Sequence, residues 1–172
     1  SLGFCYGHGI GVNKDIDTGF DYTKRAANKD WNDAQTELAY YFDIFINDAK
    51  SGYINAYFYV GLCFYYGYGT NQDFSKALYW YKQGAENGDR DCQNNIATMY
   101  QEGKGCKKDM ISAIFWYKKA AEQGNALAQN TLGLCYHWGN GVSQDYVEAV
   151  KWFRKAAEQG NALANYNIGN CY

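Results

Sequence analysis

Two helical patterns of apolar and polar positions alternate along this chain. The first lies within residues 125–136, where small and apolar side chains recur at every fourth position, the spacing of one helix face. The second opens at Asp145, a helix-capping residue type, and closes near Gly160, which suits a left-handed C-cap. Its predicted buried stripe includes the aromatic pair Trp152 and Phe153. We name these two predicted segments helix A and helix B.

The pair of helices repeats with a fixed period. A Gly-x-Gly-x-x-x-Asp motif begins at positions 139, 103, 67 and 9, with spacings of 36, 36 and 58 residues. The aromatic pair recurs 36 residues earlier as Trp116 and Tyr117. Periods of about 20 to 50 residues indicate stacked repeats, in which each unit buries its apolar face against its neighbours. The sequence therefore predicts an all-α solenoid of helix-turn-helix repeats.

The most regular stretch is Leu132–Ala162, which combines the paired glycines, the capping acid, an aromatic pair and a pair of small residues. This pattern resembles the Sel-one-like repeat, a relative of the tetratricopeptide repeat, and the resemblance covers nearly the whole chain. It implies a right-handed α/α superhelix that serves as a non-catalytic scaffold or adaptor, with a protein or peptide bound on the concave face lined by the A helices.

The resemblance leaves two alternatives open. The family includes signalling proteins and an endoplasmic-reticulum quality-control component, so the chain is also compatible with a regulatory segment of a larger protein, for example one linked to a kinase. A cysteine-rich branch has been associated with β-lactam binding and hydrolase-like activity. That branch carries paired cysteines within each repeat, a pattern missing from this sequence.

The spacing also predicts the organisation of the array. Residues 1–172 are expected to form a single array of about four to five units. The gap of 58 residues equals two periods minus fourteen, so the second unit, residues 31–52, is predicted to be truncated to a helix A over 34–42 and a shortened helix B. Both ends fall within a repeat, which predicts a longer parent chain and suggests end-to-end association through uncapped repeats.

Aromatic residues crowd around the truncated unit, and three occupy unexpected positions. Tyr57, Phe58 and Tyr59 align with residues that are polar in the regular units, such as Gln93 and Gln129. These rings either fill the space left by the missing residues or anchor a partner on the helix-A surface. The candidate partner-binding residues are Tyr57, Phe58, Tyr59, Gln93, Gln129 and Tyr166.

Composition narrows the classes of partner. The chain has 16 basic and 18 acidic residues and a net charge of −2, so it has no broad basic surface for nucleic acid or an anionic membrane. No segment approaches the roughly 18 consecutive apolar residues of a membrane span. We expect a protein or peptide partner, no nucleic acid and no membrane insertion by this segment.

The six cysteines fit a structural role. Cys5, Cys63, Cys135 and Cys171 share one repeat position, where they act as small apolar residues. Equivalent positions in stacked helices lie about 9–10 Å apart, too far for a disulfide, which requires Cα atoms within about 7 Å. The sequence predicts free thiols and, from them, a reducing cytoplasmic location, with a lumenal or secreted location left open.

No group of residues has the spacing of a catalytic or cofactor site. The two histidines, His8 and His137, fall at different repeat positions without a recurring carboxylate. The Gly-x-Gly pairs would need a preceding β-strand to bind a dinucleotide, and a predicted helix precedes each of them. We therefore expect no enzymatic activity, no cofactor and no metal.

Overall fold

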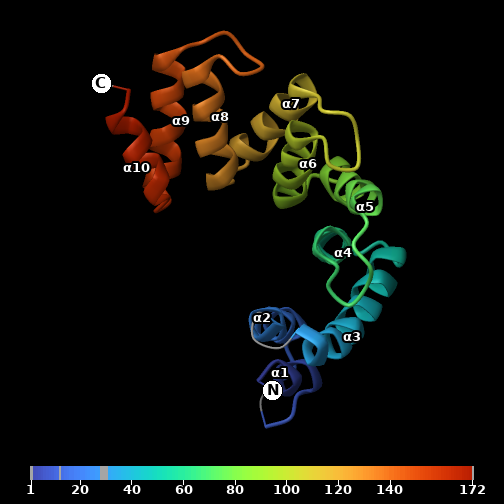
Figure 1. Ribbon diagram of the computed structural model, residues 1–172. Coiled ribbons are helices and arrows are strands. Elements are labelled where there is room, and N and C mark those ends of the chain that lie inside the picture. The colour runs from blue at the N-terminus through green and yellow to red at the C-terminus, as the bar shows by residue number, and fades with distance from the viewer. Residues whose placement is uncertain (1, 12, 28–30, 172) are drawn as a thin grey trace. The chain divides into compact units, whose positions relative to one another are not determined.

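The computed structural model describes residues 2–11, 13–27 and 31–171, which form ten α-helices and no β-strand (Figure 1). The helices are α1 Leu2–His8, α2 Ile16–Ala27, α3 Trp31–Lys50, α4 Ile54–Tyr66, α5 Phe74–Glu86, α6 Arg90–Glu102, α7 Met110–Glu122, α8 Ala126–Trp138, α9 Tyr146–Glu158 and α10 Ala162–Gly169. Helices α4, α6, α8 and α10 begin 36 residues apart, as do α5, α7 and α9. The predicted alternation of A and B helices is therefore confirmed from residue 54 onward.

The chain divides into two compact units, each with its own packing. The N-terminal unit is Ser1–Trp80 and the C-terminal unit is Tyr81–Tyr172, so the boundary falls within α5. In the N-terminal unit α3 packs against both α2 and α4. In the C-terminal unit α7 packs against α6 and α8, and α9 packs against α8 and α10.

Local chemistry sets the ends of the helices. The Asp145 carboxylate accepts a hydrogen bond from the backbone N–H of Glu148 at 2.9 Å, the predicted N-cap of α9. The Glu148 carboxylate does not complete a capping box, because it pairs with Lys151 Nζ at 2.9 Å. Helix α8 ends at Gly139 with φ +67°, a left-handed conformation that suits glycine.

Helix α3 differs from the prediction. A helix A followed by a separate, shortened helix B was expected over residues 31–52, and the structure has one continuous helix of 20 residues. The reason is local, since residues 31–50 contain neither glycine nor proline to interrupt the backbone hydrogen bonds. Gly52 follows this helix with φ +88° and lies 36 residues before Gly88, the next positive-φ glycine that follows a helix B. The last part of α3 thus holds the helix-B register. The number of units stays a prediction.

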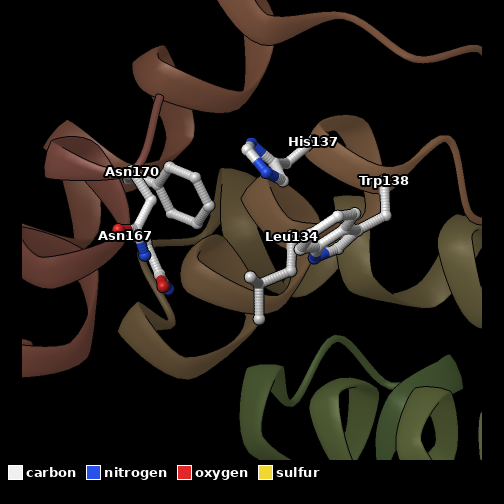
Figure 2. A pocket seen from close by; sticks show the side chains of 6 residues that line it. Leu134, His137, Trp138, Asn167 and Asn170 are labelled. Atoms are coloured by element: carbon white, nitrogen blue, oxygen red, sulfur yellow. The ribbon is translucent and has the colours of Figure 1, made fainter. Parts of the chain in front are cut away.

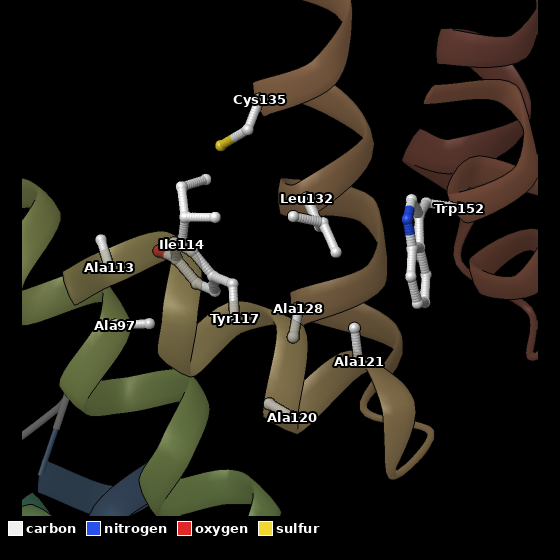
Figure 3. Close-up of a cluster of buried hydrophobic side chains, with 10 residues drawn as sticks. All are labelled: Ala97, Ala113, Ile114, Tyr117, Ala120, Ala121, Ala128, Leu132, Cys135 and Trp152. Carbon is white, nitrogen blue, oxygen red and sulfur yellow. The ribbon is translucent and has the colours of Figure 1, made fainter. Parts of the chain in front are cut away.

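The core of the C-terminal unit is built from small residues at helix crossings and larger ones between them (Figure 3). Ala97 of α6, Ala113 and Ala120 of α7 and Ala128 of α8 are fully buried, which lets the helix backbones approach closely. Side chains such as Leu132, Ile114, Tyr117 and Trp152 fill the remaining volume. This packing fixes the A helices that carry the candidate site.

Candidate functional site

Successive A helices of the C-terminal unit expose large apolar side chains. Leu127 and Trp138 at the two ends of α8 are 62% and 70% exposed, and Leu163 and Tyr166 of α10 are 66% and 70% exposed. Leu134 lies between Leu127 and Trp138 on α8 and is half-buried. We call these five residues, Leu127, Leu134, Trp138, Leu163 and Tyr166, the helix-A surface. Exposed apolar residues that recur on neighbouring elements favour binding of another macromolecule.

A cavity of about 190 Å³ opens beside Trp138 (Figure 2). Leu134, His137 and Trp138 of α8 form one side, and Asn167 and Asn170 at the end of α10 lie across from them. The buried Phe153 contributes from α9. The volume is below the roughly 300–1,000 Å³ of small-molecule sites. Apolar walls with amide groups opposite suit a single side chain and the neighbouring backbone of a peptide.

The thiol of Cys171 and the imidazole of His137 lie beside this cavity, but the pair does not resemble an activated nucleophile. Cys171 Sγ lies 3.4 Å from His137 Nδ1 and 3.3 Å from the Asn167 carbonyl oxygen. Burial raises the pKa of the Cys171 thiol, whereas a nucleophilic cysteine needs a lowered pKa to form its thiolate. The pair therefore acts as a hydrogen-bonded contact between α8 and the end of α10.

Two of the predicted partner-binding residues lie inside the C-terminal unit. Gln93 and Gln129 are 3% and 4% exposed. The Gln129 amide donates to the Ala121 carbonyl at 3.0 Å and accepts from Gln159 at 2.7 Å. Gln93 forms the matching pair of bonds with the Ala85 carbonyl and Gln123. Because both side chains are buried and hydrogen-bonded, their placement on a partner-facing surface was wrong, and they join helix A to the ends of its neighbouring B helices.

This role gives a measurable expectation for Gln129. Gln129→Ala removes two hydrogen bonds, one to the Ala121 carbonyl and one from the exposed Gln159 amide, and each such bond contributes about 0.5–1.5 kcal/mol of folding free energy. Urea unfolding measures the loss. In a double-mutant cycle with Gln159→Ala, the two losses should be less than additive; fully additive losses would show that the 2.7 Å bond does not stabilise the fold.

The three aromatic residues of the run in the N-terminal unit, Tyr57, Phe58 and Tyr59, are all half-buried. Tyr59 stacks on Phe45 at 4.5 Å and meets Phe20 edge-on at 5.9 Å, so this ring fills space between α2, α3 and α4. Tyr57 stacks on Trp80 at 6.0 Å, and Phe58 is half-buried. Of the predicted partner-binding residues, Tyr166 alone is strongly exposed.

The sequence prediction missed Trp138, Leu127 and Leu163 as surface residues. A signal for them was present, since Leu127 and Leu163 lie 36 residues apart and both fall outside the buried stripe of helix A. Asn167 and Asn170 carried no signal of this kind, because their importance depends on the cavity between α8 and α10.

All six cysteines are free thiols. Burial raises the pKa of Cys63 to about 12 and that of Cys135 to about 11, which disfavours their thiolates, and Cys92 is fully buried as well. Cys5, Cys106 and Cys171 are half-buried.

Thiol titration should resolve these two groups. In native protein at pH 8, we expect an aromatic disulfide reagent to modify the three half-buried cysteines first, because reaction requires an accessible thiolate. Cys63, Cys92 and Cys135 should react only on unfolding. The total in denaturant without reductant should be six equivalents; a total of four would show a disulfide.

The described part of the chain has neither a group of metal-binding side chains nor a membrane-spanning helix. Within residues 2–11, 13–27 and 31–171, no three His, Cys, Asp or Glu side chains come together as a metal site. None of the helices described above combines the length and the apolar character needed to span a bilayer.

The helix pairs and their 36-residue period define a class, the all-α solenoid repeat proteins. The Sel1 repeat model matches residues 1–31, 54–89, 90–125 and 126–161, and this chain belongs to the Sel1 repeat family, which confirms the predicted resemblance. Sel1 repeat proteins are generally non-catalytic scaffolds for protein interactions.

Solved structures show the same fold. A protective antigen of uropathogenic Escherichia coli with an SLR fold is 29% identical, with a TM-score of 0.75 over 98% of this chain and 39% of its own. A Sel1 repeat protein from Oxalobacter formigenes is 31% identical, with a TM-score of 0.73 over 99% of this chain and 76% of its own. Helicobacter pylori cysteine rich protein B, 22% identical with a TM-score of 0.60 over 76% of this chain and 93% of its own, shares the fold.

The chain spans well under half the length of the E. coli antigen. No curated protein sequence matches it.

Proposed function

We propose that this chain is a non-catalytic protein-interaction module that binds a peptide segment of its partner on the helix-A surface of the C-terminal unit. The observation that carries the proposal is the cavity beside Trp138, which joins an exposed apolar helix to amide side chains of the next A helix. Leu134 and Trp138 would receive an apolar side chain, and Asn167 and Asn170 would pair with peptide groups beside it.

Charge and chemistry support a peptide over other ligands. The residues that line this cavity include no aspartate, glutamate, lysine or arginine, so an uncharged side chain fits best. Tyr166 adds an exposed ring with a polar tip, a residue type that is common at binding hot spots. The six free thiols favour a reducing compartment, and we propose a cytoplasmic location on that ground.

Peptide display tests the proposal. Peptides selected on the wild-type chain should bind the double variant Trp138→Ala/Tyr166→Ala about tenfold more weakly or worse, the loss expected for hot-spot residues. The matched control is Ile111→Ala/Phe115→Ala, which removes two exposed apolar side chains, 79% and 50% exposed, from a B helix of the same unit. Circular dichroism verifies folding of both variants. Equal affinity for the first variant, or an equal loss for the control, would refute the helix-A surface as the binding site.

A further inference from the structure

A second cavity, of about 230 Å³, lies in the N-terminal unit among α2, α3 and α4. Two carboxylates line it, Asp17 from α2 and Asp48 from α3, together with three aromatic rings, those of Phe45, Tyr53 and Tyr59. No lysine, arginine or histidine is among its lining residues. The lining of this cavity is therefore acidic, whereas the lining of the cavity beside Trp138 has no acidic residue.

The cavity occurs where α3 replaces a regular pair of helices. Helix α3 contacts both α2 and α4, and the cavity takes residues from all three helices. Asp48 holds the register of Gly84, Ala120 and Ala156, small residues at helix crossings in the later units. A carboxylate at such a crossing does not favour close packing of the helices, because burial of a charged group costs free energy.

Tyr53 departs from the register in a similar way. It precedes α4 at the position where Asp89, Asn125 and Asn161 cap the later A helices with their side chains. Tyr53 makes no side-chain cap, and its ring is 66% exposed at the cavity. Helix α4 therefore lacks the side-chain N-cap that stabilises the later A helices. In its place, an accessible aromatic ring lines the same cavity as the two carboxylates.

The carboxylates lack a positive partner in the described residues. The ion pairs found there involve neither Asp17 nor Asp48. Loss of hydration raises the pKa of Asp17, and the negative charges of Asp15 and Asp21 add to this effect, while a hydrogen bond with the Tyr59 hydroxyl opposes it. A cation in the cavity would relieve both the lost hydration and the repulsion between like charges.

We propose that this cavity binds the guanidinium group of an arginine side chain on a protein partner. A guanidinium is planar, donates hydrogen bonds in a fork that matches carboxylates, and stacks on aromatic rings. Asp17 and Asp48 supply the carboxylates, and Tyr53 supplies an accessible ring. The volume is below that of a drug-sized site, so one side chain fits. The proposal names partner chemistry and so rests on the proposed protein-binding function, although it concerns a different cavity.

Short peptides test it on the intact chain. The probe is acetyl-Gly-Arg-Gly-amide, with the citrulline peptide as a neutral, nearly isosteric control and the lysine peptide as a second cation. Backbone amide NMR spectra should show saturable shifts confined to α2, the end of α3 and the start of α4. We expect affinity for the arginine peptide about tenfold or more above that for the citrulline peptide, as charge-assisted hydrogen bonds require. Equal affinity for citrulline would overturn the proposal, and equal affinity for lysine would overturn its assignment to a guanidinium.

Charge-removing variants locate the site. Asp17→Asn and Asp48→Asn keep the side-chain shape, and each should abolish most of the preference for arginine over citrulline. The control Asp43→Asn removes the same charge from an exposed position of α3 outside the cavity and should leave the preference intact. Loss of the preference in Asp43→Asn as well would overturn the site, because it would show a response to net charge alone. If the arginine peptide does not bind, the peptides selected by display should still bind at Trp138. The two experiments therefore test the two proposals independently.

Discussion

Phe153→Ala should lower the free energy of unfolding by about 3–5 kcal/mol, the range for removing a buried aromatic ring. The Phe153 side chain is fully buried between α8 and α10 in the C-terminal unit. A Cβ placed on Gly133 of α8 would lie 2.5 Å from this ring, so the ring packs directly against the helix backbone. A rigid backbone cannot collapse into the space, which places the cost toward the upper end of the range. Urea unfolding followed by circular dichroism measures it.

Phe115→Ala is the matched control. Phe115 lies on α7, a B helix of the same unit, and is 50% exposed. Its removal should change stability by at most about 0.5 kcal/mol, as for other surface substitutions. Similar losses for the two variants would contradict the burial assigned to Phe153.

The elements that the sequence predicted correctly depend on local chemistry. Asp109 and Asp145 cap α7 and α9 through hydrogen bonds to backbone N–H groups two or three residues ahead. Gly103 and Gly139 end α6 and α8 in the left-handed conformation. Each of these signals lies within a few residues of the feature it specifies, and the 36-residue period repeats it.

Burial at single positions was harder to predict. Trp116 and Tyr117 form one predicted buried pair, yet Tyr117 is 2% exposed and Trp116 is only half-buried at the edge of the cluster. Gln129 has a polar side chain, but Gln159 and the Ala121 carbonyl surround it with hydrogen-bonding partners. The helical period assigns each residue to a face of its helix. It does not show which side chains or hydrogen-bonding groups of the neighbouring helix contact that face.

The two candidate binding cavities could not be predicted from the sequence pattern either, because each depends on which helices lie side by side. Tyr166 was selected from its register and is exposed, whereas Trp138 was not selected and lies at a cavity that needs the end of α10 beside it. In the N-terminal unit, Asp17 of α2 and Asp48 near the end of α3 are 31 residues apart in the sequence and line the same cavity. The missing loop in the sequence is compatible with a separate, shortened helix B or with one fused helix. The two arrangements would place different residues beside Asp48.

Gly69→Ala should lower the free energy of unfolding of the N-terminal unit by about 2–5 kcal/mol. Gly69 has φ +64°, where an alanine costs about 1–2 kcal/mol. A Cβ there would also overlap the backbone of Leu38 and Ala39 in α3, an overpacking that adds about 1–3 kcal/mol. The loop cannot move away freely, because the Gln35 amide donates to the Gly67 carbonyl at 2.8 Å and accepts from the Gly69 N–H at 2.7 Å.

Gly52→Ala separates the two contributions to this loss. Gly52 has φ +88°, and a Cβ there meets nothing within 4 Å, so its replacement should carry only the backbone cost of about 1–2 kcal/mol. Thermal and urea unfolding of both variants give the difference, which we expect to be at least about 1 kcal/mol in favour of Gly52→Ala. An equal loss would show that the glycine loop yields to the added methyl group. Gln35 would then not hold the loop against α3, and the contact between this loop and the fused helix would contribute little to the fold.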